Sequence, residues 1–448
     1  MKTTRREALK LGLSGIACFS IESTVPRWIF RSARAMADCL PPDRILIILQ
    51  QAGGNDGLNM VIPRTDGIYY DSQTRPNIHI PKGLEINLDG LNGFHPKLDK
   101  LADWYQQGVV GIVQNIGYEN PSFSHFTATD YWEFGTVPGA PLPRQGWVAR
   151  LYDSACAAVQ DPDALLAVVA GTSGGTPDAL KGMTGYAPPT IDSPAAYDLQ
   201  ASSDVALRSA AISALNAIPT LDAQIDFLQR SEKSLEASTQ DIAGAGAVPL
   251  LVEAAAYTND SLGKGLKLAS QVIRAGFGTR IFYVSQGGYD THANEVNPSD
   301  PANAGRYAAL MSNLNSNVDA FLREMQLSGN LDRVLILTFS EFGRRVAENG
   351  STGTDHGAAN CLFVIGGQVR GGVYGGQPDL NGATLFQGNL RYRIDFRTVY
   401  ARVIESWLGL PAAPVFGQNA YDTVISPQLS EIDLLDTVAP VRPRLARA

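Results

Sequence analysis

The run RILIILQQAGGND, from Arg44 to Asp56, decides the fold. Its first eight residues are almost continuously apolar, which is typical of a strand that is covered on both faces in a parallel sheet. Gly53 and Gly54 then allow a sharp turn that brings Asp56 to the edge of that sheet. The stretch therefore predicts a buried strand with a polar turn at its end, although Asp56 could simply bond its own backbone there.

Five further runs of the same kind follow along the chain. They are VVGIVQNI from Val109, ALLAVVAG from Ala164, TRIFYVSQ from Thr279, RVLILTFS from Arg333 and CLFVIGG from Cys361. Helical periodicity accompanies them in PKLDKLADWYQQG, SLGKGLKLASQVIRAG, YAALMSNLNSNVDAFLREMQLSG and FRTVYARVIESWLG. This alternation predicts an α/β fold, a three-layer α/β/α sandwich with a mostly parallel central sheet.

Residues 172–260 interrupt the alternation, because a turn-rich stretch is followed there by a helical one. We interpret this region as an insertion or cap over the carboxyl edge of the sheet. A plain helical excursion is an equal alternative. The domain that carries this insertion is predicted to span residues 38–448.

The first residues, TTRREALKLGLSGIACFSI, contain the paired arginines Arg5 and Arg6 before a mildly apolar run. This pattern is typical of a twin-arginine export signal, and small residues predict cleavage that removes residues 1–37. The run is too short for a stable membrane span, and no later segment is long and apolar enough. We therefore expect a periplasmic or extracellular protein that the twin-arginine translocase exports, with an uncleaved anchor as the alternative.

Charge and cysteine content exclude other classes. The formal net charge is −8, which is unsuited to nucleic-acid binding because that binding depends on neutralising phosphates. Beyond the signal the chain keeps Cys39, Cys156 and Cys361, which allow at most one disulfide. The absence of a CxxC pair argues against a thiolate zinc site.

Polar side chains follow several predicted strands, at the edge where open α/β sheets bind ligands. In GGYDTHANE, Asp290 and His292 stand two residues apart and could bind one metal ion together. In SFSHFTATD, the hydroxyl of Ser124 or Thr127 could act as a nucleophile if a base or a metal lowers its pKa. The alternative for these hydroxyls is helix capping.

The segment SEFGRRVAENGSTGTDHGAAN carries a further cluster. Glu341 and Arg344 come just after a strand, and Asp355 and His356 come just before the next one. Arg344 or Arg345 could bind an anionic group with two hydrogen bonds, whereas the alternative is a salt-bridged loop. Because all of these clusters lie at strand ends, they predict one site along one edge of the sheet.

The chain resembles a family of secreted twin-arginine proteins known as domain of unknown function 1501. The matching stretches, in order, are GGNDGLNMVIP, FHPKLDKLADWYQQG, SFSHFTATDYWEFG, GGYDTHANE, TFSEFGRR, GTDHGAANCLFVIGG and DFRTVYARVIESWLG. They cover nearly the whole chain after the signal. That family in turn resembles the alkaline phosphatase and sulfatase superfamily, whose α/β/α hydrolases and phosphomutases hold one or two metals.

The resemblance implies a role for each candidate residue. It implies metal ligands at Asp56, Asp290, His292, Glu341 and His356, and a nucleophile at Ser124 or Thr127. An alternative register puts Asp355 and His356 on the Asp-His pair of the superfamily and leaves no final histidine. The chain departs from the pattern in either register, because Phe342 stands where a histidine is expected and the D-x-x-x-H spacing is absent. The departure counts against a two-zinc phosphatase.

We therefore expect an exported metal-dependent hydrolase of phosphate or sulfate esters, acting on an anionic small molecule or polysaccharide. The cofactor would be a divalent metal: zinc, manganese or calcium. Ser124 is the expected nucleophile with Thr127 second, Arg344 would clamp the anion, and Asp355 would support His356. The alternatives are a non-catalytic secreted binding or assembly protein on a degenerate hydrolase fold, and a serine hydrolase that uses His125 or His292 without metal.

Overall fold

The computed structural model describes residues 40–41, 43–156, 165–183, 187–194 and 241–435, together with the isolated positions Ala214, Gln229 and Thr239. The predicted signal, residues 1–37, lies outside the described residues, as does most of the predicted insertion, so both stay predictions. Within the described part of the chain, no helix combines the length and the apolar character needed to cross a membrane.

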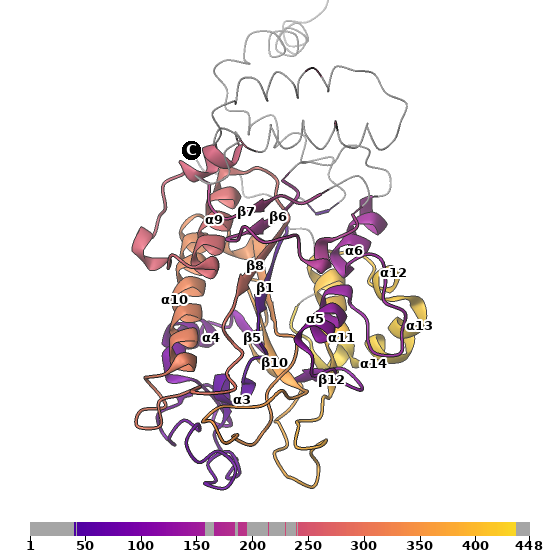
Figure 1. Ribbon diagram of the computed structural model, residues 1–448. Coiled ribbons are helices and arrows are strands. Elements are labelled where there is room, and N and C mark those ends of the chain that lie inside the picture. Colours follow the sequence, from indigo (N-terminus) through magenta and orange to yellow (C-terminus); the bar gives the residue numbers. More distant parts are fainter. Residues whose placement is uncertain are drawn as a thin grey trace, which may run out of the picture.

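A nine-stranded sheet forms the centre of the protein (Figure 1). Its strands lie in the order β11-β5-β10-β9-β1-β8-β6-β7, and β12 pairs with β5. The strands span β1 (Ile45–Gln51), β5 (Val110–Gly117), β6 (Ala167–Ala170), β7 (Thr190–Ile191), β8 (Ile281–Gln286), β9 (Val334–Phe339), β10 (Asn360–Ile365), β11 (Gly372–Tyr374) and β12 (Ile394–Asp395). Among the described residues, every pairing in this sheet is parallel except those that β10 makes with β9 and β5. All six apolar runs are therefore confirmed as strands.

Helices cover both faces of the sheet (Figure 1). Along β1, Ile45, Ile47 and Leu49 join the buried cluster that includes residues of α4, α9 and α10, whereas Leu46 and Ile48 join the one that includes residues of α6 and α11. The helices that form the layers are α4 (Asp99–Gln106), α9 (Ser261–Ala275) and α10 (Arg306–Leu327) on one face, and α5 (His125–Phe134), α6 (Trp147–Cys156) and α11 (Phe396–Arg402) on the other. The predicted three-layer α/β/α sandwich is thus confirmed.

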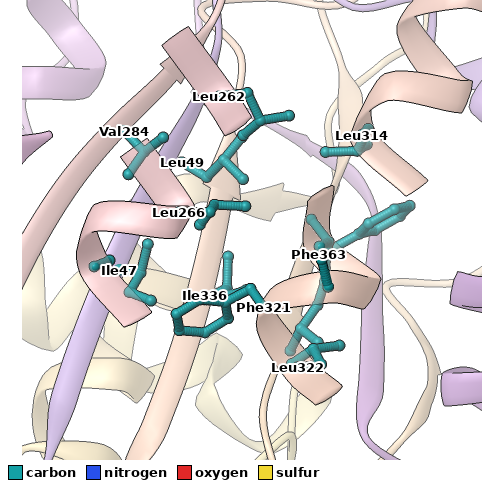
Figure 2. Close-up of a cluster of buried hydrophobic side chains, with 14 of the residues drawn as sticks. Ile47, Leu49, Leu262, Leu266, Val284, Leu314, Phe321, Leu322, Ile336 and Phe363 are labelled. Atoms are coloured by element: carbon teal, nitrogen blue, oxygen red, sulfur yellow. The ribbon is translucent and has the colours of Figure 1, made fainter. Parts of the chain in front are cut away.

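The first of these layers buries a large apolar surface. Figure 2 shows Leu262 and Leu266 of α9 and Phe321 of α10 beside Ile47 and Leu49 of the central strand, all within 1 % of complete burial. Each such side chain contributes about 1.5–3 kcal/mol of transfer free energy when it is fully buried. The amphipathic repeats of the helices and the apolar strand are therefore matched to one another.

Short elements flank this core. They are α3 (Gly57–Met60), a second sheet of β2 (Val61–Pro63), β4 (Asn92–Phe94) and β3 (Ile86–Asn87), and the carboxyl-terminal helices α12 (Ala413–Phe416), α13 (Gln418–Ala420) and α14 (Ser426–Gln428). The first strand of the second sheet, β2, follows β1 in the chain after only the polar turn and α3.

The antiparallel strand β10 gathers the polar segments at one edge. Its first residue, Asn360, pairs with Ile116 near the carboxyl end of β5. The chain that leaves the carboxyl end of β9 therefore returns to β10 at the same edge. The segments after β1, β5, β8 and β9 and the segment before β10 all meet there, which explains why Asp355 and His356 lie beside residues that follow other strands.

The turn after β1 requires glycine. Gly53 and Gly54 have φ values of +125° and +76°. A Cβ atom on Gly53 would lie closer than 3.0 Å to the backbone nitrogen of Asp290, and one on Gly54 would lie as close to the ring of Phe342. The turn thus fits tightly against the loop after β8 and the loop after β9.

We expect Gly53→Ala to lower the free energy of unfolding by about 1–3 kcal/mol through the left-handed backbone strain alone, and by more through the contact with Asp290. Gly287→Ala is the matched control, because it lies on the same edge and its Cβ would meet nothing within 4 Å. Urea unfolding of both variants measures the difference. Equal losses would show that the tight fit of the turn is not required.

Candidate metal centre

Three imidazoles and one carboxylate converge at this edge of the sheet. One ligand atom each of His125, Asp290 and His356 lies within 4.8 Å of the other two. His292 joins them, since its Nε2 atom lies 2.8 Å from His356 Nε2 and 3.3 Å from Asp290 Oδ1. We call these four residues the ligand cluster.

Glu341 holds the imidazole of His125 through its Nδ1 atom. The Nδ1 atom of His125, the first residue of α5, lies 2.7 Å from Glu341 Oε1. Because an ionised carboxylate only accepts hydrogen bonds, Nδ1 carries the hydrogen, and in the neutral ring Nε2 keeps its lone pair. That Nε2 atom lies 3.6 Å from Asp290 Oδ2. Glu341 is itself anchored by the backbone N–H of Gly53, 2.9 Å from Oε1.

His356 has the same orientation, with a backbone carbonyl in place of the carboxylate. Its Nδ1 atom donates to the carbonyl oxygen of Phe123 at 2.6 Å, so Nε2 faces Asp290 Oδ1 at 3.6 Å. Burial lowers the pKa of His356, and the charges of Arg344 and the neighbouring imidazoles add to that shift against the raising effect of the Phe123 carbonyl. The ring is therefore held in its neutral form, which is the form that binds a metal.

His292 completes the pattern. Its Nδ1 atom lies 3.3 Å from Asp355 Oδ1, which also accepts from Asn349 Nδ2 at 3.1 Å. The hydrogen bond from Asn349, and then the one from His292, lower the pKa of Asp355 against the effect of burial. The Nε2 atoms of His292 and His356 lie only 2.8 Å apart, so a hydrogen on one of them is shared with the other unless a cation takes its place.

Arg344 keeps Asp290 in place and ionised. Burial raises the pKa of Asp290, but the hydrogen bond and charge of Arg344, with the neighbouring imidazoles, outweigh it, and the net shift is downward. The Nη2 atom of Arg344 lies 2.7 Å from Asp290 Oδ1. The guanidinium also donates to four backbone carbonyls, those of Gly53, Gly54 (2.7 Å), Thr354 (2.8 Å) and Tyr289 (3.2 Å).

These contacts do not support the predicted anion clamp at Arg344. Its side chain is completely buried, whereas that of Asp290 is half exposed. Every nitrogen of the guanidinium already donates inside the protein, so a substrate anion cannot reach it in this structure. Arg345, the alternative, donates to the carbonyl oxygen of Gln387 at 2.5 Å.

The three other predicted metal ligands lie outside the ligand cluster. Asp56 is buried, and both of its carboxylate oxygens accept from Arg75 Nη2, at 2.9 and 2.8 Å. Glu341 and Asp355 instead hold the Nδ1–H groups of His125 and His292. Carboxylates that bind the far nitrogen of a ligating histidine orient the ring and raise its basicity. The two have supporting positions, as was expected of Asp355, although it supports His292 rather than His356.

The candidate nucleophiles lie at the start of α5. Ser124 is the N-cap residue directly before His125, and its hydroxyl makes no capping hydrogen bond. Both Ser124 and Thr127 are exposed. Ser124 thus directly precedes a residue of the ligand cluster, and its hydroxyl is not used for helix capping. Thr127 lies further along the helix.

Sequence reasoning missed His125 as a ligand and Phe342 as a structural element. Phe342 is buried, and its ring centroid lies 4.9 Å from that of His125 and 4.5 Å from that of His356. It therefore forms an apolar floor under the two imidazoles, at the position where the family resemblance led us to expect a histidine. His125 follows a predicted strand in a chain of five histidines, and that signal could have identified it.

The donor set fits a metal ion of intermediate hardness. Three imidazole nitrogens and one carboxylate suit zinc, manganese or iron, whereas calcium prefers an all-oxygen set. The orientation of the imidazoles, the lowered pKa of Asp290 and the close Nε2 atoms of His292 and His356 all favour a bound cation. The ligand cluster therefore fits one divalent metal better than two.

Residues 222–410 match the model of a family described as "Protein of unknown function (DUF1501)", the family that the sequence motifs resemble. No curated protein matches the sequence. Solved structures similar to the chain include the lipoteichoic acid synthase LtaP from Listeria monocytogenes, with 11 % identity, a TM-score of 0.34 and coverage of 75 % of this chain and 70 % of that one.

Two further solved structures are similar. Ps i-CgsB has 11 % identity and a TM-score of 0.37 over 86 % of this chain and 76 % of its own. The PsFucS1 sulfatase from Pseudoalteromonas sp. has 12 % identity and a TM-score of 0.27 over 78 % of this chain and 68 % of its own. TM-scores this low carry no weight for the activity, so the fold class rests on the strand order and layers described above.

We expect the purified protein to bind zinc or manganese, and Asp290→Asn or His356→Ala to weaken that binding by about 100-fold or more, because each removes a ligand atom. Isothermal titration with each metal measures the affinity. His79→Ala is the control, since His79 lies outside the cluster and contacts the carbonyl oxygen of Arg75. Cluster variants that bind as tightly as the parent would contradict the assignment.

Proposed function

We propose that this chain, a member of the DUF1501 family, is an exported metal-dependent hydrolase of phosphate or sulfate esters. The observation that carries the proposal is the ligand cluster: the Nε2 atoms of three histidines and the Asp290 carboxylate meet at the carboxyl edge of a mostly parallel sheet. That edge is where open α/β sheets bind their ligands. Export is proposed from the paired arginines Arg5 and Arg6 alone.

A divalent metal in the ligand cluster would act as a Lewis acid, lowering the pKa of a hydroxyl or water and neutralising charge on the transferred group. The chain supplies the rest of the chemistry. Ser124 offers an exposed hydroxyl beside His125, and the amino terminus of α5 directs backbone N–H groups toward negative charge there. Arg344 keeps Asp290 ionised, and Phe342 excludes water from beneath the imidazoles.

Exposed aromatic residues near the site support an ester with a bulky organic part. In the chain, Phe123 and Phe126 flank Ser124 and His125, and they are 37 % and 86 % exposed. Exposed phenyl rings pack against the apolar faces of sugars and aryl groups, whereas an inorganic ester would leave them in water. We therefore favour a sugar or aryl ester as the anionic substrate, in line with the expectation of a small molecule or polysaccharide.

A non-catalytic binding protein is the second candidate, and a specific observation favours it. Asp56, Glu341 and Arg344 bond only to other parts of the protein, so fewer groups remain for catalysis than the superfamily resemblance implies. Such a protein would bind metal and an anionic ligand without turnover. Turnover therefore separates the two candidates.

We expect the metal-loaded protein to hydrolyse one or more members of a panel of aryl and sugar phosphate and sulfate esters, and a chelator to abolish the activity. Ser124→Ala should lower kcat by at least about 100-fold while metal content stays unchanged, because only the nucleophile is lost. Thr127→Ala is the matched control on the same turn and should keep most of the activity.

The comparison has two informative failures. Full activity in Ser124→Ala together with a large loss in Thr127→Ala would assign the nucleophile to Thr127, three residues further along the chain. Tight metal binding with no turnover of any ester would overturn the hydrolase and leave the binding protein.

A further inference from the structure

We propose that Glu295 is a positioning residue that ties together the two loops carrying Asp290, His292 and His356. This role rests on the proposed metal centre. Glu295 lies three residues beyond His292 and is completely buried, and its side chain accepts from Asn59, Thr291 and Thr354, which are not residues of the ligand cluster.

A single carboxyl oxygen of Glu295 holds both loops. Its Oε2 atom accepts from the hydroxyl of Thr291 at 2.9 Å and from the hydroxyl of Thr354 at 2.9 Å. Thr291 stands between Asp290 and His292, and Thr354 stands two residues before His356. One side-chain atom therefore bridges the two ligand-bearing segments, and its removal leaves two buried hydroxyls without this partner.

Backbone hydrogen bonds also join the two loops. The Thr354 N–H donates to the carbonyl oxygen of Thr291 at 3.2 Å, and the Glu295 N–H donates to that of Thr352 at 2.9 Å. A Cβ atom on Gly353 would lie closer than 3.0 Å to Thr291. The loops are thus in direct contact, and the Glu295 side chain closes the contact from the buried side.

The other carboxyl oxygen connects the loops to the segment after β1. Its Oε1 atom accepts from Asn59 Nδ2 at 3.1 Å, and Asn59 Oδ1 accepts from Arg75 Nη1 at 2.9 Å. Arg75 in turn forms the buried ion pair with Asp56. Asp56 therefore belongs to the base that supports the ligand cluster, which is a different role from the one predicted for it.

The charges around Glu295 indicate that it keeps its proton. The groups that face it are Asp56, Arg75 and Tyr307, so two carboxyl groups share one guanidinium in a buried region. Burial first, and then the charge and hydrogen bond of Asp56, raise the pKa of Glu295 to about 8, against the lowering effects of Arg75 and Thr354. A neutral carboxyl group has the shape of an amide, so the amide oxygen of a glutamine can take the place of Oε2 and keep both threonine hydroxyls, while its NH2 group loses only the bond from Asn59.

Zinc affinity of the full-length protein tests the role. We expect Glu295→Ala to weaken zinc binding by about 10-fold to 100-fold, the range found when support of a ligand is lost, and Glu295→Gln to stay within about threefold of the parent. Glu324→Ala is the matched control, because Glu324 is equally buried and accepts from the N–H groups of Leu251 and Val252, away from the site. It should leave zinc affinity within about threefold.

Hydrogen exchange provides a readout that needs no metal. Exchange at Thr354 and Glu295 or its replacement should speed up in Glu295→Ala and stay near the parent rate in Glu295→Gln. Unchanged zinc affinity and exchange in Glu295→Ala, or an equal loss of affinity in Glu324→Ala, would overturn the role. A parent that binds zinc but hydrolyses no ester would overturn the proposed hydrolase alone, and a parent that binds no zinc would overturn this role as well.

The raised pKa also predicts how stability changes with pH. A glutamate in the unfolded chain loses its proton near its ordinary pKa of 4.5, whereas folded Glu295 keeps it up to about pH 8. Between these values the folded state binds more protons, so this residue makes the free energy of unfolding fall as pH rises. Urea unfolding at pH 5 and pH 8 should give a smaller fall in Glu295→Gln than in the parent. Parallel curves would contradict a retained proton.

Discussion

The buried guanidinium of Arg344 is the interaction on which the rest of the site depends. It bonds the two glycines of the turn after β1, the loop after β8 and the loop before β10, and it pairs with Asp290. A buried charge is costly unless it is paired and fully hydrogen-bonded, and here the backbone carbonyls of three loops satisfy that requirement. The loops therefore cannot separate without leaving the charge unsatisfied, and Asp290 is held where the imidazoles converge.

Around this charge, neighbouring groups fix the orientation of each imidazole in the site. Glu341 and Asp355 hold imidazole hydrogens on the far nitrogens of His125 and His292, while Phe123 does so for His356. Metal affinity depends on such support as well as on the ligands themselves. Many polar groups around the ligand cluster thus bond to other parts of the protein. Few of them are left exposed to a substrate.

The sequence predicts the fold and the edge of the site well, and the roles at the edge poorly. Continuous apolar runs identify the strands because burial on both faces selects for them, and strand ends bring Asp290, His292 and His356 together. Asp56 and Arg344 bond to Arg75 and to the carbonyls of three loops, which are tertiary contacts that no local pattern records. His125 also follows a strand end, and its place in the ligand cluster depends on α5, which sets its Nδ1 atom against Glu341.

The position of β1 in the sheet has a consequence for how the chain folds. Its neighbours β8 and β9 pair with it from the second half of the sequence, so the middle of the sheet cannot close until most of the polypeptide has been synthesised. Contacts between such distant segments make folding slow, because a long loop must be closed before any pairing energy is gained. The ligand cluster needs segments from both halves of the chain, so a chain that stops before β8 lacks three of its four residues, Asp290, His292 and His356.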